Sequence, residues 1–187
     1  MLLGIDGSGK TTTAAALAAA ERSEGRRALL LRNRSGRRWL IRAGQRIGRE
    51  LPVKWADRTE TVVRTCNVLV AHVRAARTDG LAIMDRHLAC QLVLRQVRGR
   101  PPGRILPWLS ERLLRRALVV VLDVPAETAH ARITARGEDD ESLDFLRATR
   151  SAYLQFASTR GWTVVDASGS TPAVLDRIRQ GAISGRP

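Results

Sequence analysis

The sequence of 187 residues contains little cysteine, few aromatic residues and no long hydrophobic run. Two cysteines, Cys66 and Cys90, are too few for a disulfide scaffold, and neither they nor the three histidines form a metal-ligand pattern. The longest apolar run on a strand-like stretch, residues 117–122, is far shorter than the ~20 residues of a membrane span. The first predicted strand starts at Met1, so we expect no signal peptide. These absences exclude the membrane and secreted classes and favour the reducing cytoplasm.

Positive charge, in contrast, is abundant. Arginine and lysine total 32 against 18 acidic residues, which gives a net charge of +14, and ten arginines fall within residues 22–49. This balance favours polyanionic partners, either nucleic acid or a nucleotide with its phosphates, although a bias towards arginine on a solvated surface would produce it equally well. Aromatic residues make up only 4% of the chain, too few for a base-stacking platform. We therefore expect weak, non-specific nucleic-acid binding at most.

Apolar residues alternate between strand and helix periodicities along almost the whole chain. Five buried strands are predicted at residues 1–5, 28–31, 81–84, 117–122 and 162–165. Helices are predicted at residues 11–24, 39–51, 62–76, 124–137, 143–157 and 172–180, with another ending near residue 97, followed by a loop at 98–104. This alternation predicts an α/β fold, a five-stranded parallel sheet with helices on both faces. No repeat or linker interrupts it, so residues 1–187 are expected to form one domain.

Residues 4–11 read Gly-Ile-Asp-Gly-Ser-Gly-Lys-Thr and match G-x-x-x-x-G-K-[ST] without deviation. Glycines let consecutive backbone N–H groups point at phosphate oxygens, and the following helix adds the partial positive charge of its N-terminus. Lys10 can then neutralise the β- and γ-phosphates, and Thr11 can offer its hydroxyl to Mg²⁺. The motif predicts a P-loop that binds a nucleoside triphosphate, and we expect Lys10 to be exposed to that ligand.

Further polar residues lie where the crevice of an open parallel sheet is expected. Asp85 and Asp123 come at the carboxyl ends of the third and fourth predicted strands. Asp85 could instead pair with the adjacent Arg86, and Asp123 is better placed to cap the following helix. Arg132 and Arg136 are four residues apart on one predicted helix and project together, either into the crevice or as solvated surface charge.

The order and spacing of several motifs resemble those of the thymidylate kinases, a branch of the P-loop nucleoside-monophosphate kinases. The matching stretches are residues 4–12, Asp85-Arg86-His87 for the family's D-R-[YH], L-D-V-P-A-E at 122–127 with R-G at 136–137, and E-S-L-D-F and R-S-A-Y within 141–153. V-D-A-S at 165–168 resembles the family's adenine-side loop. The resemblance implies a P-loop kinase fold and transfer of the ATP γ-phosphoryl group to a nucleoside monophosphate or a nucleotide-like acceptor. It leaves a homodimer open.

The resemblance also implies roles for single residues. Nucleotide contacts fall on Gly4, Asp6, Gly7, Ser8, Gly9, Lys10, Thr11, Thr12, Asp166 and Ala167. Catalytic roles fall on Lys10, Asp85, Arg86, Arg132, Arg136 and Arg150. Arg132 and Arg136 lie in a short lid at about residues 132–144, and Arg150, on the next predicted helix, would close over the transferred phosphoryl group with them. Acceptor contacts fall on Asp6, Arg32, Arg64, Arg86 and Arg95, partly in a basic acceptor-side segment at about residues 32–60. Thr11 and Asp85 would serve the Mg²⁺, Asp85 by ordering a metal-bound water.

The sequence departs from the family mainly on the acceptor side. The family's R-E-P-G-G-T is replaced by R-N-R-S-G-R at residues 32–37, and the lid before Glu141 is shorter and lacks an arginine of its own. The positions of the family's Tyr and Gln after D-R-[YH] hold Leu94 and Arg95. Leucine has no ring face or hydroxyl and arginine has no acceptor atom. We therefore predict that dTMP is a poor substrate, and that another nucleotide or an anionic nucleotide-like metabolite is preferred.

Three alternative functions stay open. A nucleoside or small-molecule kinase of specialised metabolism could share the same fold. A P-loop ATPase or GTPase associated with nucleic acid or protein would suit the charge of +14, but the D-T-A-G-like strand end and the N/T-K-x-D of such GTPases are missing. A non-catalytic nucleotide-binding module is compatible with the departures from the family pattern.

Overall fold

The computed structural model describes residues 1–33, 53–137 and 141–184, and only the backbone of 53–60 and 182–184. The predicted helix at 39–51 and most of the basic acceptor-side segment therefore lie outside the described residues, as does part of the lid. No helix of the described ranges is long and apolar enough to cross a membrane.

The predicted parallel sheet of five strands is confirmed. The strands are β1 (Leu2–Leu3), β2 (Ala28–Arg32), β3 (Leu81–Asp85), β4 (Val120–Asp123) and β5 (Thr163–Asp166). All pair in parallel in the order β2-β3-β1-β4-β5, which places β1 in the centre and brings Leu2 opposite both Asp85 and Val120. The central strands are buried on both faces, which is why they read as continuous apolar runs rather than as alternating ones.

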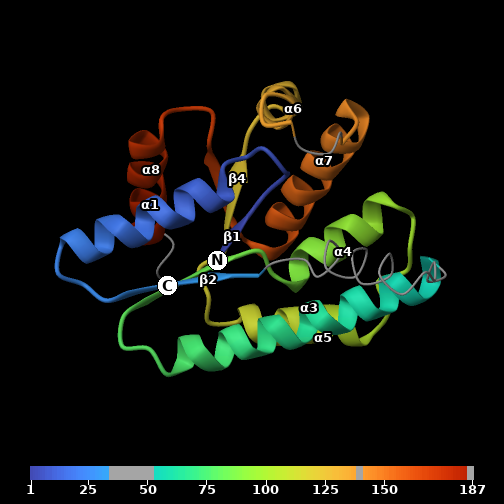
Figure 1. Ribbon diagram of the computed structural model, residues 1–187, viewed down its shortest axis with the longest axis horizontal. Coiled ribbons are helices and arrows are strands. Elements are labelled where there is room, and N and C mark those ends of the chain that lie inside the picture. Colours follow the sequence, from blue (N-terminus) through green and yellow to red (C-terminus); the bar gives the residue numbers. More distant parts are fainter. Residues whose placement is uncertain (34–52, 138–140, 185–187) are drawn as a thin grey trace.

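Helices cover both faces of this sheet, as the sequence predicts (Figure 1). They are α1 (Lys10–Ser23), α3 (Val53–Ala76), α4 (Leu88–Val97), α5 (Ile105–Leu114), α6 (Ala126–Thr134), α7 (Leu143–Arg160) and α8 (Thr171–Ser184). Alternate strand residues point to opposite sides: Leu2 packs with α1 and α8, whereas Leu3 packs with α4, α6 and α7. A smaller cluster joins Val68 of α3 to α4 and α5.

The structure differs from the sequence prediction in several places, and helix α3 begins at Val53, well before the predicted start at residue 62. Helix α5 occupies residues 105–114, where no helix was expected, and β4 begins at Val120 instead of residue 117. Pro107 lies in the first turn of α5, where its missing N–H costs no helical hydrogen bond, so this proline does not prevent the helix. The end of α5 then runs into a turn in which the Ala117 amide bonds the Leu114 carbonyl, and this turn delays the strand.

Candidate active site

The loop between β1 and α1 curls tightly between the end of β4 and helix α6. Gly4 and Gly7 adopt φ values of 141° and 78°, which side chains other than hydrogen rarely permit. A Cβ on Gly4 would lie 2.5 Å from the Leu122 carbonyl oxygen, and one on Gly7 would lie 2.5 Å from that of Ala129. Both glycines are therefore required by backbone conformation and by close packing, and the loop is held against two neighbouring elements.

Lys10 is buried in this structure, with only 6% of its surface exposed, and its contact with a bound nucleotide stays a prediction. The curled loop brings the Ile5 carbonyl oxygen to 2.6 Å from Nζ, which donates a hydrogen bond to it. Nζ also lies 3.6 Å from Oδ1 of Asp6. Burial lowers the pKa of Lys10, and the negative charge of Asp6 opposes that shift.

Thr11 and Asp85, both predicted to serve a metal ion, are brought together from α1 and β3. The Thr11 hydroxyl donates to Oδ2 of Asp85 at 2.6 Å. Asp85 is buried, and its Oδ1 has no hydrogen-bond partner within the described chain. An unpartnered carboxylate oxygen beside a hydroxyl suits Mg²⁺, which usually binds one or two carboxylates together with water and substrate phosphates. The residues present therefore fit the ion.

Arg86 turns away from Asp85 and pairs with Asp6 of the P-loop. Its Nη2 lies 2.9 Å from Oδ1 of Asp6, so the ion pair between Asp85 and Arg86 considered from the sequence is not the one observed. The left-handed backbone of Arg86, with φ at 73°, directs the side chain across the loop. Burial would raise the pKa of Asp6, but the charges of Lys10 and Arg86 outweigh it and hold that pKa below its ordinary value.

Of the three lid arginines, two lie near the loop. Arg132 donates from Nη1 to the Gly7 carbonyl oxygen at 3.3 Å, and Arg136 donates from Nε to the Arg132 carbonyl oxygen at 3.0 Å. Arg136 is also close enough for its charge to lower the pKa of Asp6. Arg132 on α6 and Arg136, in the turn after that helix, therefore lie together beside the P-loop, although the helix ends before Arg136 and the two residues do not share one helix as predicted.

Arg150 on α7 has a different environment. Its Nε and Nη2 donate to the two carboxylate oxygens of Asp123 at 2.6 and 2.8 Å. The prediction that Asp123 caps the next helix was wrong, because Pro125 precedes α6 and no side chain caps that helix. The packing of α7 on α6 and β4 brings Arg150 over the strand end, where a bidentate pair is the stronger use of the carboxylate.

The adenine-side residues lie at the end of β5. Asp166 is exposed, accepts a hydrogen bond from the Ser168 amide at 3.0 Å and pairs with Arg177 at 2.9 Å. Ala167 buries its side chain in the core and donates its amide to the Asp123 carbonyl oxygen at 2.7 Å. The turn after β5 is thus fixed to the end of β4, and the Ala167 side chain does not face outward.

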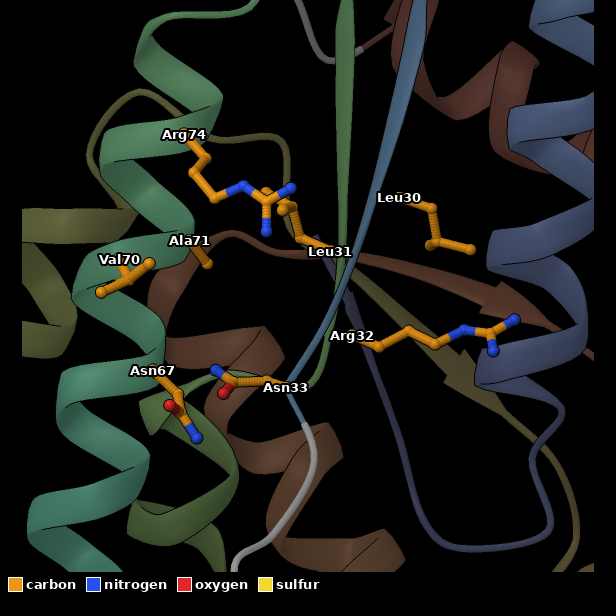
Figure 2. Close-up of a pocket in the computed structure, with 8 residues that line it drawn as sticks. All are labelled: Leu30, Leu31, Arg32, Asn33, Asn67, Val70, Ala71 and Arg74. Carbon is orange, nitrogen blue, oxygen red and sulfur yellow. The ribbon is translucent and has the colours of Figure 1, made fainter.

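The arginines predicted for the acceptor lie on separate elements and have different environments. Arg64 is buried on α3. Arg32 points from β2 towards the α1 side of the sheet, as Figure 2 shows. Arg95 donates to the carbonyl oxygens of Pro101 and Pro102 at 3.3 and 3.4 Å and so supports the loop after α4. Arg86 contacts the P-loop through its ion pair with Asp6.

Two polar residues near the site were missed at the sequence level. Asn33 follows β2, donates its amide to the Asp85 carbonyl oxygen at 3.0 Å and buries an Oδ1 that accepts no hydrogen bond from the described residues. With Asn67 and Arg74 of α3 it lines a hollow of about 270 Å³ (Figure 2). Burial raises the pKa of Glu141, and the negative charge of nearby Asp6 raises it further. Asn33 carries no motif signal by itself, whereas Glu141 begins the E-S-L-D-F stretch but received no role from the sequence.

Comparisons with known proteins agree with this geometry. A family model described as Thymidylate kinase matches residues 3–178. The chain is 30% identical to the thymidylate kinase of Rhodopirellula baltica, over 94% of this chain and 76% of that protein. It is 27% identical to the probable thymidylate kinase of Archaeoglobus fulgidus (95% and 90% covered) and 30% identical to the thymidylate kinase of Xanthomonas campestris (96% and 85% covered). With its P-loop, its D-R-H segment and this match along most of its length, the chain belongs to the thymidylate kinase family of nucleotide kinases.

Proposed function

We propose that this chain transfers the γ-phosphoryl group of ATP to a nucleoside monophosphate, with Mg²⁺ served by Thr11 and Asp85. The observation that carries the proposal is the contact between Asp6 and both Lys10 and Arg86. This contact places a cation of the triphosphate loop next to a cation of the D-R-H segment. A phosphate of ATP and the phosphate of the acceptor can be held side by side there.

The residues then need to supply position and charge rather than covalent chemistry. Lys10 and the loop amides hold the triphosphate, Arg86 holds the acceptor phosphate, and Arg132 stands at Gly7 where it can stabilise charge on the transferred group. When bound, Mg²⁺ neutralises charge on the phosphate oxygens. The acceptor phosphate is already a nucleophile at neutral pH, so the site requires no strong general base.

We further propose that dTMP is not the preferred acceptor. Leu94 offers no polar group, Arg95 is engaged by loop carbonyls, and Asn33 stands where the family carries a glutamate. A pocket that pairs the polar groups of one base rejects bases that leave those groups unpaired, so a changed set of donors and acceptors redirects selection. The hollow beside Asn33 and Asn67 is where amide side chains could do so.

A panel assay of ADP release tests both proposals. ATP is offered with each nucleoside monophosphate, with the corresponding nucleosides, and with no acceptor. ADP release only with monophosphates supports the kinase, and release without any acceptor would favour an ATPase instead. A kcat/KM for dTMP above ~10⁵ M⁻¹s⁻¹, within the ordinary enzyme range, and far ahead of the other acceptors would contradict the second proposal.

The assembly and compartment are proposals as well. The apolar side chains of Val62, Leu69, Val70 and Val73 are exposed on α3, and a second copy of the chain could cover them in a homodimer. Light scattering of V70E beside the unchanged protein tests this, because a charged residue in the interface should lower the mass. We place the enzyme in the reducing cytoplasm, where its free cysteines would persist.

A further inference from the structure

Two histidine side chains meet where α3 packs on the D-R-H segment. The Nε2 atoms of His72 and His87 lie 3.2 Å apart, and the rings meet edge to face with centroids 5.4 Å apart. His87 is fully buried, and His72 is half-buried on α3. Neither imidazole has a part in the chemistry proposed above, so their contact needs an explanation of its own.

The hydrogen bonds assign the protons of the two rings. Nδ1 of His87 accepts the Ala89 amide at the start of α4, at 3.4 Å, so neutral His87 carries its proton on Nε2. That proton can be donated only to an unprotonated Nε2 of His72. Two protonated Nε2 atoms would repel each other at 3.2 Å, so the contact requires a lone pair on Nε2 of His72. The contact is therefore one hydrogen bond that His87 donates to His72.

His87 directly follows Arg86, the one non-glycine residue in the described ranges with a positive φ. L-residues avoid this conformation, so the neighbours on both sides must hold it in place. On one side, Asp85 is fixed by strand pairing and by the Thr11 hydroxyl. On the other side, His87 is fixed by the first turn of α4 and by His72.

The same face of α3 joins this contact to a second arginine. Arg64, Val68 and His72 recur every four residues, so they line one face of the helix. Val68 is fully buried and packs with Leu88, the residue after His87. Loss of the His72 contact would therefore disturb both the D-R-H segment and the face of α3 that carries Arg64.

We propose that His72 is a positioning residue for phosphoryl transfer: by accepting the hydrogen bond of His87, it holds the Arg86 backbone in the conformation in which its guanidinium reaches Asp6 and the acceptor phosphate. The inference rests on the proposed role of Arg86. It goes beyond that role, because His72 touches neither a substrate nor a reacting atom.

Two variants test it. His72→Phe keeps an aromatic ring but removes the acceptor, whereas His72→Gln can place an amide oxygen near the position of Nε2. The acceptor is the nucleoside monophosphate that is turned over fastest in the ADP-release panel. For H72F we expect the acceptor KM to rise about threefold to tenfold, the size of one lost hydrogen bond, with the KM for ATP unchanged. For H72Q we expect the acceptor KM to return close to that of the unchanged protein.

Arg86→Ala is measured in parallel to separate the two proposals. If R86A raises the acceptor KM but H72F does not, the role of His72 is wrong and the proposed function stands. If R86A itself leaves the acceptor KM unchanged, the proposed function fails. An equal rise of both KM values in H72F, or no rescue in H72Q, would show a merely structural histidine. If thermal unfolding shows that H72F is not folded, the smaller His72→Leu replaces it. The acceptor KM should again rise while the KM for ATP stays unchanged.

Discussion

Arg86 donates a hydrogen bond to Asp6 across 2.9 Å, although the two residues are 80 positions apart in the sequence. The same Asp6 oxygen lies 3.6 Å from the Lys10 ammonium, so one carboxylate holds a cation from each half of the crevice. Two cations and one anion leave this group of three residues with excess positive charge. Such an excess is suited to binding phosphate groups. The contribution of each cation to phosphate binding can be measured by replacing one residue at a time.

The first prediction concerns Lys10. Replacement by alanine removes charge-assisted contacts worth about 2–3 kcal/mol in the transition state, so kcat should fall at least tenfold. The Ile5 carbonyl also loses its partner, so a modest loss of stability, about 1 kcal/mol, should accompany it. The control is Arg116→Ala, which removes an exposed positive charge after α5 and should keep full turnover. Unchanged ATP turnover in K10A would remove the central claim.

The second prediction separates the two substrates. Arg86→Ala should weaken acceptor binding about tenfold or more, because it removes a charge-assisted contact to phosphate, and should leave ATP binding almost unchanged. Calorimetric titration of each ligand alone measures this. Arg112, exposed on α5, provides a control in which neither affinity should change after replacement by alanine. Equal losses for both ligands in R86A would indicate that the arginine only supports the loop.

The third prediction compares two glycines with nearly the same φ. A Cβ on Gly7 would meet the Ala129 backbone at 2.5–2.9 Å, whereas a Cβ on Gly25, at φ 76°, would have no atom within 4 Å. Gly25→Ala should therefore cost about 1 kcal/mol of unfolding free energy from the left-handed backbone alone. Gly7→Ala should cost about 3 kcal/mol or more, because the α6 backbone must also move. Equal costs in urea denaturation would contradict the close packing of the loop on α6.

The fourth prediction is a pH dependence of stability. Glu21 on α1 accepts from Arg26 at 2.5 Å and lies 3.4 Å from Arg179 on α8. The hydrogen bond from Arg26 is the main reason that its pKa is below the ordinary value. A carboxylate with a lowered folded-state pKa stabilises the protein above its unfolded-state pKa, and this contribution is lost as the pH falls through the folded-state value.

Glu21→Gln should therefore be less stable than the unchanged protein at pH 7, by about 1–2 kcal/mol for the weakened charged hydrogen bonds. The difference should shrink as the pH falls below 4.5. Thermal unfolding across this range measures it. Glu24→Gln is the control, because Glu24 shares both arginine partners but is exposed. A difference that persists unchanged at low pH would show that packing, and not charge, explains the effect.

The fifth prediction concerns the net charge of +14. RNA and DNA should bind weakly, without sequence preference, and with an affinity that falls steeply between 50 and 200 mM salt, as expected for release of counterions. Fluorescence anisotropy with labelled oligonucleotides measures this. Nanomolar, salt-resistant binding to one defined oligonucleotide would instead favour a nucleic-acid-associated ATPase.

The strands and the P-loop could be predicted because each has a local cause. Buried parallel strands need continuous apolar runs, and a phosphate-binding loop needs glycines before its lysine. Helix α5 was missed because the residues between the predicted loop at 98–104 and the predicted strand at 117–122 were assigned to no element, although the first turn of a helix accepts a proline such as Pro107. Local patterns therefore identified the sheet and the phosphate end of the site.

The rest of the site depends on contacts between distant residues. Arg150 binds Asp123 from 27 positions away, and no local rule predicts that pair over a helix cap. Arg32 and Arg95 occupy positions predicted to contact the acceptor, but their directions depend on which side of β2 faces α1 and on the path of the loop after α4. The burial of Lys10 likewise follows from how the loop closes on Ile5.

The central position of β1 has a consequence for how the molecule folds during synthesis. Leu2 pairs with Asp85 on one side and with Val120 on the other, so the first strand to leave the ribosome cannot complete its pairing until about two thirds of the chain has been made. Contacts of such long sequence separation form slowly, because the chain between them must first be closed into a loop. We therefore expect the nucleotide-binding loop, although encoded first, to be among the last parts of the protein to become ordered.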